Sequence, residues 1–249
     1  MNINEFCKEL RLPFMCENHK ILIDEAVKTG QPYDEFLHHL LENEYLLKQS
    51  NSIKRKIKEA QFPQKLYISD FDKTVYNEKF IAKFSEMETL EFINERQNII
   101  LLGATGAGKT FYATALGILA CQQGKRVLFV SVADLIIKLK ETMSLNQISS
   151  FKRKFSTFDL VIIDELGYYS FGKEIAELFF NILSCREKRG SIIITTNLNF
   201  DEWTGPLGDP KLASALISRI CRQAHIIELE REIDGRMQDT LDWMKSRHK

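Results

Sequence analysis

The residues best suited to chemistry in this chain stand together in one glycine-rich segment. It reads Gly103-Ala104-Thr105-Gly106-Ala107-Gly108-Lys109-Thr110 and is followed by Phe111. This is the pattern G-x-x-x-x-G-K-[ST], in which glycines let the backbone curl so that its N–H groups face phosphate oxygens. The start of the following helix adds partial positive charge. The segment therefore predicts a nucleotide site, with Lys109 on the β and γ phosphates and the Thr110 hydroxyl on Mg²⁺.

An acidic pair, Asp164-Glu165, ends the apolar run of residues 160–163. A carboxylate at the tip of a buried strand beside a phosphate loop is where Mg²⁺ needs a ligand or a water anchor, so Asp164 is the expected metal residue. Glu165 is the expected general base, because hydrolysis needs a group that polarises water whereas a small-molecule kinase must keep water away. The pair therefore favours hydrolysis over phosphoryl transfer.

Asn197 is the third candidate catalytic residue, and it follows another apolar run at residues 191–195. The carboxyl ends of parallel strands line one crevice, so the amide of Asn197 can bind the attacking water or the γ-phosphate. Taken alone, an asparagine after a strand is more often a turn residue. The order along the chain, with a phosphate loop, an acidic pair and then a polar strand tip, resembles that of the AAA+ ATPases.

Five short, β-branched apolar runs must position these residues: 98–102, 126–131, 159–163, 191–195 and 225–229. Each run is apolar on both faces, as expected for strands of a parallel sheet that helices cover on both sides. Helical segments separate the runs. The pattern predicts an α/β fold with a five-stranded parallel sheet between helices. The resemblance to the AAA+ ATPases implies that this is an AAA+ P-loop NTPase domain.

Upstream of these runs, residues 1–60 carry apolar side chains at helical spacing and predict a small all-α N-terminal domain. Residues 61–85 are expected to form an irregular connector dotted with aromatic side chains, and residues 86–249 to form the ATPase domain. The stretch after the last run is short, so no C-terminal lid domain is expected.

The composition is that of an ordinary globular protein, with 249 residues of which 44% are hydrophobic and 27% are charged. The 34 Lys and Arg residues balance 34 Asp and Glu residues, so any DNA contact must come from local patches. Five scattered cysteines without metal-ligand spacing predict free thiols. No membrane span or signal peptide is recognisable, which predicts a cytoplasmic protein with no membrane partner.

Several motifs follow one another along nearly the whole chain. They are Phe36-Leu37 to Leu41 with Glu44, Ala60-Gln61-Phe62-Pro63, Phe71-Asp72, Gly103 to Thr110, Asp164-Glu165-Leu166-Gly167-Tyr168, Thr195-Thr196-Asn197 with Trp203, and Gly208-Asp209-Pro210 through Leu212-Ala213 to Ser218-Arg219-Ile220. In these motifs the chain resembles the IstB family of insertion-sequence transposition helper ATPases, near relatives of the DnaC helicase loaders. The resemblance implies ATP-dependent assembly on duplex DNA, deformation of that DNA, and recruitment or stimulation of a transposase.

By this resemblance Arg219 is the arginine presented to a neighbouring subunit's nucleotide, with Arg222 as the second candidate. A guanidinium fork suits charge spread over the transferring phosphate oxygens. The resemblance thus implies a homo-oligomer with shared ATP sites. The aspartate that usually precedes this arginine is Ser218 here, so an orienting salt bridge from that position is missing. The family's usual Gly-x-Ser-Tyr-Arg is replaced by residues 230–236, so Arg236 receives no nucleotide-sensing role.

Two groups of basic residues are the predicted contacts to DNA phosphates, which bind without reading bases. They are Lys54, Arg55, Lys56 and Lys58 in the helical domain, and Lys138, Lys152, Arg153 and Lys154 between the second and third strands. A solvated helix face is the alternative for both groups.

The leading prediction is thus an ATPase that uses ATP and Mg²⁺ and helps DNA transposition, with duplex DNA, further copies of itself and a cognate transposase as partners. The alternative is a DnaC-like replicative helicase loader with the same catalytic residues. A more distant alternative is a small-molecule P-loop kinase. The last alternative is a protein that binds ATP only as an assembly ligand.

Overall fold

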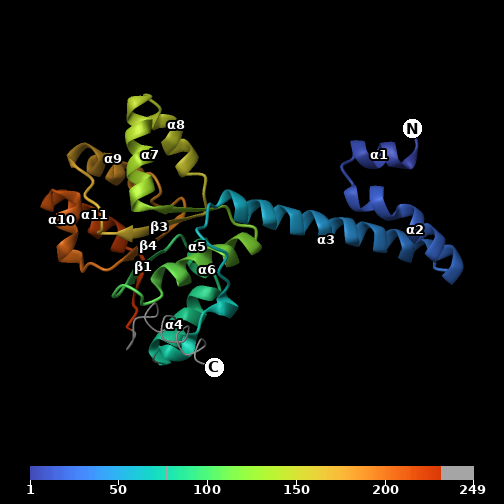
Figure 1. Cartoon of the computed structure of the whole chain (residues 1–249), viewed down its shortest axis with the longest axis horizontal. Helices are drawn as coiled ribbons and strands as arrows, with labels where there is room; N and C mark the ends of the chain where they lie inside the picture. The colour runs from blue at the N-terminus through green and yellow to red at the C-terminus, as the bar shows by residue number, and fades with distance from the viewer. Residues whose placement is uncertain (77, 231–249) are drawn as a thin grey trace, which may run out of the picture. The chain divides into compact units, whose positions relative to one another are not determined.

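The computed structural model describes residues 1–76 and 78–230 (Figure 1). Contacts divide the chain into two compact units, of which the first is Met1–Arg55 and the second begins at Lys56. Residues 61–76 and 78–85 belong to the second unit, whereas a separate connector is expected from the sequence. The finer domain boundaries stay predictions. The expected lack of a lid domain and the role of Arg236 concern residues outside those described.

The first unit consists of three helices, α1 (Ile3–Glu9), α2 (Pro13–Thr29) and α3 (Tyr33–Glu59), the last of which runs past the unit boundary. Asn2 and Glu5 form a capping box at the start of α1. Pro13 occupies the first turn of α2, where its missing N–H costs nothing, and Gly30 ends that helix with a left-handed φ of 65°.

Glu44 of α3 is a buried charged residue in this unit, with 3% of its surface exposed. Its Oε2 accepts a hydrogen bond of 3.0 Å from the N–H of Met15, which lies in the first turn of α2. The carboxylate thereby satisfies one of the N–H groups that a helix start leaves without an intrahelical partner. Glu44 is therefore a fold-determining residue of the helical unit.

The second unit is built on a five-stranded parallel sheet in the order β2-β3-β4-β1-β5. The strands are β1 (Asn98–Leu102), β2 (Val127–Ser131), β3 (Leu160–Leu166), β4 (Ser191–Thr196) and β5 (Ala224–Glu228). The predicted fold class and all five runs are confirmed. Because β4 lies between β1 and β3, the carboxyl ends of these three strands meet at one edge of the sheet.

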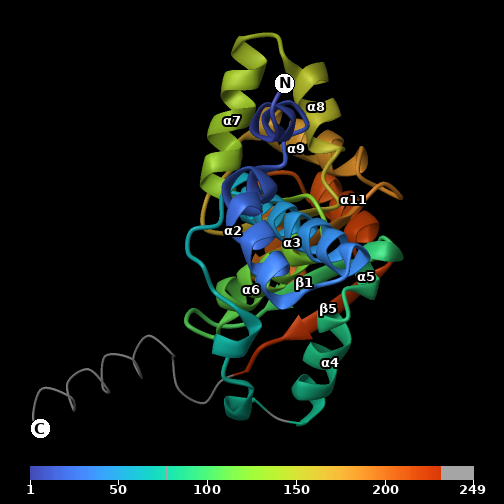
Figure 2. The same ribbon diagram turned by 90° about the vertical axis from the view of Figure 1, so that its right-hand side faces the viewer.

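Helices cover both faces of the sheet, as Figures 1 and 2 show. One face carries α7 (Val132–Ser144), α8 (Ile148–Phe155), α9 (Lys173–Ser184), η3 (Phe200–Trp203), α10 (Thr204–Leu207) and α11 (Pro210–Cys221). The other carries η1 (Ile68–Asp70), η2 (Lys73–Val75), α4 (Glu78–Glu88), α5 (Glu91–Asn94) and α6 (Lys109–Gln122). The site elements are thus held between two apolar layers.

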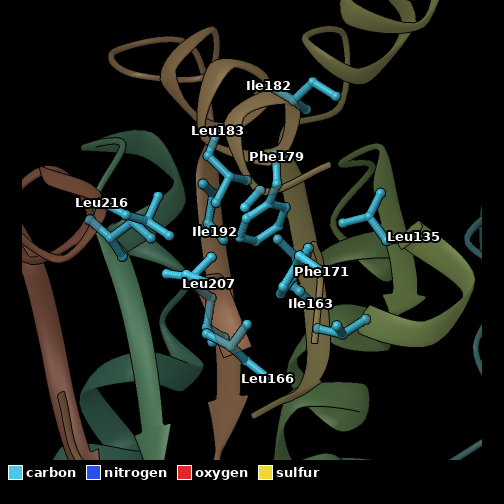
Figure 3. Packing of buried hydrophobic residues seen from close by; sticks show 14 of the residues in the cluster. Leu135, Ile163, Leu166, Phe171, Phe179, Ile182, Leu183, Ile192, Leu207 and Leu216 are labelled. Atoms are coloured by element: carbon cyan, nitrogen blue, oxygen red, sulfur yellow. The ribbon is translucent and has the colours of Figure 1, made fainter. Parts of the chain in front are cut away.

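The two apolar layers explain why the strands read as continuous apolar runs. Ile163 and Ile192 pack with Phe179 of α9 on one face (Figure 3), while Ile162 and Ile193 pack with the α6 layer on the other. Alternate strand residues point to opposite faces, so a strand covered on both sides has no polar face. Burial of both faces of the sheet therefore holds in place the strands that carry the site residues.

Two further sequence predictions concern cysteines and membranes. All five cysteines are free thiols, as predicted. Burial raises the pKa of the Cys121 thiol to about 12. Within the described ranges, none of the helices has the length and apolar character that crossing a bilayer requires.

Candidate nucleotide-binding site

The phosphate loop lies between β1 and α6, and its glycines adopt backbone conformations that other residues rarely do. The φ angles of Gly103, Gly106 and Gly108 are 144°, 79° and 92°. A Cβ at Gly103 would lie 2.4 Å from the carbonyl oxygen of Leu229. A Cβ at Gly108 would lie 2.5 Å from the hydroxyl of Tyr76. At Gly103 and Gly108, both the positive φ angle and the close approach of Leu229 or Tyr76 therefore require glycine.

Lys109 is the first residue of α6, and its ammonium is turned back over the loop. Its Nζ donates hydrogen bonds of 2.6 Å to the carbonyl of Gly103 and 2.7 Å to that of Ala104. An ammonium offers three donors and no acceptor, so oxygens of a bound phosphate can replace these carbonyls as its partners. The loop thus holds a positive charge where a phosphate chain would lie against the start of α6.

Asp164 joins the loop to the centre of the sheet. Its carboxylate is 5% exposed and accepts hydrogen bonds from the Thr110 hydroxyl, at 2.9 Å to Oδ1 and 3.2 Å to Oδ2. The Thr195 hydroxyl donates to the same Oδ1 at 2.6 Å. Side chains from α6, β3 and β4, far apart in the sequence, therefore meet at one buried carboxylate.

Burial raises the pKa of the Asp164 carboxyl, while hydrogen bonds from Thr195 and Thr110 and the charge of Lys109 act against that shift. A buried carboxylate loses hydration, and a divalent cation beside it would offset that loss. Carboxylate and hydroxyl oxygens are also the ligands that Mg²⁺ takes. The residues present thus fit a magnesium ion held between Asp164 and Thr110.

Glu165 lies next to the buried Asp164, at a bulge in β3. The pairing of β3 with β4 shifts register between Ile163 and Leu166. Within the bulge Asp164 is buried, while Glu165 is exposed and has a left-handed φ of 65°. Its N–H donates to Thr195 Oγ1 at 2.9 Å, which holds this conformation. A bulge re-aims side chains, and here it separates two adjacent acids into a buried one and a solvent-facing one.

Asn197 follows β4 directly, and its side chain lies beside the segment that follows β3. Its Oδ1 is 3.4 Å from the position that a Cβ would take at Gly167. Since Thr196 pairs with Leu102, the last residue before the loop, Asn197 stands at the same sheet edge as the loop. Its predicted contact with the γ-phosphate or the attacking water stays a prediction.

Aromatic residues of the segment before the sheet support the loop, a role that sequence reasoning missed. The Tyr76 hydroxyl donates to the carbonyl of Ala107 at 2.6 Å, and the Phe71 ring stacks on Tyr76 with centroids 5.4 Å apart. Phe111 is half-buried and its ring centroid lies 5.5 Å from that of Phe71. The predicted contact of Phe111 with the nucleotide stays a prediction. The spacing of aromatic residues in this segment was the available signal.

Tyr168 contacts the loop from the segment that follows the acidic pair. Its hydroxyl and that of Thr105 are 2.9 Å apart, and the Tyr168 side chain is otherwise half in solvent, with 51% exposed. Nothing in the spacing of the two residues indicates this contact, because they are 63 positions apart. The hydrogen bond ties the outer side of the phosphate loop to the chain that leaves β3.

Arg219 lies at the opposite edge of the sheet from the phosphate loop of its own chain. It stands near the end of α11, where the Asn98 side chain at the start of β1 donates to the carbonyl of Ile220 at 3.0 Å. The loop follows the other end of β1, and a strand of this length spans on the order of 15 Å. Arg219 is therefore too far away to act on its own loop.

The missing aspartate at Ser218 does not leave Arg219 without an acidic partner. Glu187, in the turn after α9, lies 3.5 Å from Arg219 Nε through its Oε2. Its Oε1 is 3.1 Å from Nη1 of Arg222. Position 218 offers no carboxylate, as expected, but tertiary packing brings the carboxylate of Glu187 to Arg219 from a different element.

The first group of predicted DNA contacts is split by its local environment. Lys54, Arg55 and Lys58 are exposed. Lys56, by contrast, is half-buried and its ammonium donates to the carbonyl of Gly124. The ammonium of Lys56 is thus engaged inside the second unit, which disfavours its predicted contact with DNA.

The second group lies on the helical pair α7 and α8, which pack against each other and lie side by side in Figures 1 and 2. Lys152, Arg153 and Lys154 form the last turn of α8, and the latter two are exposed. Lys138 of α7 donates to Gln61 Oε1 at 3.2 Å. The end of α8 is therefore the accessible part of this group.

A family model described as "IstB-like ATP binding protein" matches residues 6–240. The chain belongs to this IstB-like family. A relative from Geobacillus stearothermophilus, named as an ATP-binding protein of insertion sequence IS5376, is 33% identical over 92% of both chains. Another from Pseudomonas aeruginosa, named for insertion sequence IS21, is 31% identical over 90% of this chain and 84% of its own.

Solved structures with the same fold include replication proteins. AMPPCP-bound DnaA from Aquifex aeolicus has a TM-score of 0.60 and 20% identity, covering 75% of this chain and 56% of its own. DnaI has a TM-score of 0.57 and 21% identity, covering 73% of this chain and 99% of its own. At this identity the likeness concerns the fold alone, and it agrees with the α/β fold of this IstB-like chain.

Replacing Thr195 tests how much the site depends on the hydroxyl that joins its two acids. Thr195→Val keeps the shape but removes the donor to Asp164 and the acceptor for the Glu165 N–H. We expect the free energy of unfolding to fall by about 1–3 kcal/mol, as for a buried hydrogen bond left unmade, and kcat for ATP to fall as well. Denaturant unfolding and steady-state hydrolysis measure the two effects.

Thr196→Val is the matched control, because the Thr196 hydroxyl donates to the carbonyl of Leu166 and accepts from the N–H of Leu198, which are both backbone groups. It should lose comparable stability and keep most of its hydrolysis. An equal loss of kcat in both variants would contradict a specific role for Thr195.

Proposed function

We propose that this IstB-like chain is an Mg²⁺-dependent ATPase that assembles with copies of itself on duplex DNA and thereby helps a transposase. The observation that carries the proposal is the continuous set of contacts from Lys109 over the loop through Thr110 and Asp164 to Thr195, with Glu165 exposed beside it. These contacts bring together a cationic loop, a buried carboxylate that suits a metal ion and a solvent-facing acid at one sheet edge.

The chemistry proposed is attack of water on the γ-phosphorus of ATP. A bond forms between the water oxygen and phosphorus, the bond from phosphorus to the β–γ bridging oxygen breaks, and the electron pair leaves with ADP. Glu165 accepts the proton that the water loses. Lys109 and the loop N–H groups bind the phosphate oxygens on which charge accumulates. Asn197 orients the water or the γ-phosphate from the neighbouring strand tip.

Mg²⁺ would be held by Asp164 and Thr110, and when bound it neutralises charge on the phosphate oxygens. The role of the protein side chains is to keep that position polar within an apolar layer. Thr195 orients the Asp164 carboxylate by donating to Oδ1, and the Thr110 hydroxyl contacts both carboxylate oxygens.

Sharing of ATP sites between subunits is supported by the location of Arg219. It is out of reach of its own loop, so a role in hydrolysis requires the nucleotide of a second copy. Its guanidinium would stabilise charge on the transferring phosphoryl group, as an arginine supplied in trans does. The proposed oligomer is therefore one in which the α11 end of one subunit meets the loop of the next.

Transposition as the setting is supported by the relatives, whose names place them in insertion sequences. Duplex DNA is the proposed polymer because the exposed cations at the end of α8 suit phosphates and carry no base-reading pattern. A replicative helicase as client is the alternative. Capture of a purified transposase or a purified helicase by the full chain with ATP would distinguish the two.

The proposal is tested by measuring ATP hydrolysis with and without duplex DNA while light scattering follows the mass of the protein. Hydrolysis that requires Mg²⁺ and increases with duplex, together with ATP-dependent growth in mass, is the expected result. A monomer whose hydrolysis ignores duplex would contradict the assembly and DNA parts of the proposal.

Removing the three cations at the end of α8 should weaken binding to duplex of any sequence. For Lys152→Ala, Arg153→Ala and Lys154→Ala combined, the slope of log K against log salt concentration should become shallower by about 0.9 per lost phosphate contact. Titrations of labelled duplex at several salt concentrations measure this slope. Replacing the exposed lysines Lys65 and Lys173 by alanine is the control, and an equal loss there would contradict a local patch.

A further inference from the structure

Arg219 is held by a cluster of side chains outside its own helix. Its Nη1 donates to Ser184 Oγ, its Nε faces Glu187 Oε2, and its guanidinium carbon lies 4.9 Å from the centroid of the Phe180 ring. Ser184 and Phe180 belong to α9, and Glu187 to the turn that follows it. The long, flexible Arg219 side chain thus has a hydrogen bond, an ion pair and a cation–π contact with residues outside its own helix.

Arg222 is the contrasting case on the same helix end. Its side chain is 68% exposed and it faces the other oxygen of Glu187, whereas the Arg219 side chain is 35% exposed. One carboxylate therefore lies between two guanidinium groups that would otherwise repel each other. Of the two arginines, Arg219 is the one whose orientation is determined by packing.

The turn that carries Glu187 is itself anchored by Arg186. The Arg186 side chain is fully buried, and its guanidinium donates to the carbonyls of Phe155, Phe158 and Ser191. Burial lowers the pKa of this guanidinium to about 10, so it keeps its charge at neutral pH. Arg186 thus ties the turn to the segments at the starts of β3 and β4. The backbone that carries Glu187 is therefore anchored to the sheet.

The surroundings are suited to receive an anion from outside. A cavity of about 210 Å³ at the amino end of the sheet is lined by Arg219 and Arg222 together with Arg96 and Lys188. Glu187 is the acid among them, and it is one-third exposed. The phosphate chain of a nucleotide bound to a second copy carries the charge that would match this cationic surface.

We propose that Glu187 is a positioning residue for hydrolysis in the neighbouring subunit: with Ser184 and Phe180 it holds Arg219 in the orientation that reaches the second copy's nucleotide. The inference rests on the proposed function, since it requires shared ATP sites. It assigns to a different element the role that the family's aspartate would have at Ser218. Preorganisation of this kind speeds a reaction because the cation needs no reorientation as charge develops.

The test compares Glu187→Ala with Arg219→Ala and with the control Glu177→Gln, an exposed acid on the same helix α9. Glu187→Ala should lower kcat by up to about 10²-fold, the effect of a misplaced group, with KM for ATP unchanged. Arg219→Ala should lower kcat more, by about 10³-fold or beyond. Glu177→Gln should match the unmodified protein, and Glu187→Asp should recover part of the activity.

An experiment that mixes two variants distinguishes positioning of Arg219 for the neighbouring subunit from a structural effect of Glu187 within its own subunit. An assembly of Glu187→Ala and Glu165→Gln subunits contains interfaces where an intact site meets a correctly held arginine. At equal amounts we expect about a quarter of the unmodified hydrolysis, since about one interface in four pairs the two intact halves. Activity equal to the sum of the separate variants would mean that Glu187 acts within its own subunit, which overturns the proposal.

Hydrolysis by the single variants also tests the positioning role and the proposed function separately. If Arg219→Ala abolishes hydrolysis while Glu187→Ala leaves it intact, the positioning role fails and the proposed function stands. Full activity of Arg219→Ala would remove the shared site, and with it both the positioning role and the sharing of ATP sites in the proposed function. Faster hydrolysis by Glu187→Ala would show that Glu187 restrains the arginine, and that result also contradicts positioning.

Discussion

Lys109→Ala should abolish both ATP binding and ATP hydrolysis. The ammonium is the charged donor poised over the loop, with carbonyls of Gly103 and Ala104 as its partners. Its removal leaves the β and γ phosphate oxygens without their cation in both the ground state and the transition state. We expect a loss of at least about 10²-fold in kcat/KM.

Nucleotide binding for Lys109→Ala is measured with a fluorescent ATP analogue, and hydrolysis by phosphate release. Lys65→Ala, which removes an exposed lysine of the same unit, should bind and hydrolyse ATP normally. Thermal unfolding without nucleotide shows whether the loop variant keeps the fold. A folded Lys109→Ala protein that turns over ATP at the normal rate would falsify the assignment of the loop.

Glu165→Gln should separate ATP binding from hydrolysis. Glutamine has the size of glutamate and keeps the N–H that donates to Thr195, so the bulge should persist. It has no basicity to accept a proton from water, and loss of a general base costs about 10²–10⁴-fold in rate. We expect kcat to fall by that factor while ATP binding and ATP-dependent assembly survive.

The measurement is single-turnover hydrolysis together with light scattering in the presence of ATP and duplex DNA. Glu174→Gln replaces another exposed acid, in the first turn of α9, and should leave both readouts unchanged. If Glu165→Gln hydrolyses ATP normally, the base is another group, and the exposed position of Glu165 at the bulge has no catalytic consequence.

The match between sequence and structure is best where the chemistry is local. Gly103 to Thr110 works as a continuous segment whose glycines, lysine and threonine act through the backbone that connects them. The five strands could likewise be predicted, because apolar runs covered on both sides have no polar positions to confuse the pattern. Local sequence is sufficient when the interacting groups are neighbours along the chain.

The match is poorest where a residue depends on a partner from a distant element. The tie between Thr195 and Asp164 spans 31 positions, and it exists because β4 lies beside β3 in the sheet. Glu187 lies beside Arg219 only because α9 packs against α11. Neither pair has a signature in spacing or composition.

What this sequence by itself determined is therefore the set of chemical groups: a phosphate loop, an acidic pair, a polar strand tip and a family whose members share them. Only the tertiary structure decided which groups touch, that Glu165 faces solvent while Asp164 is buried, and that Arg219 is remote from its own loop. The physical reason is that apolar patterning specifies which face of an element is buried, whereas the order of the strands and the packing of helix on helix specify the neighbour.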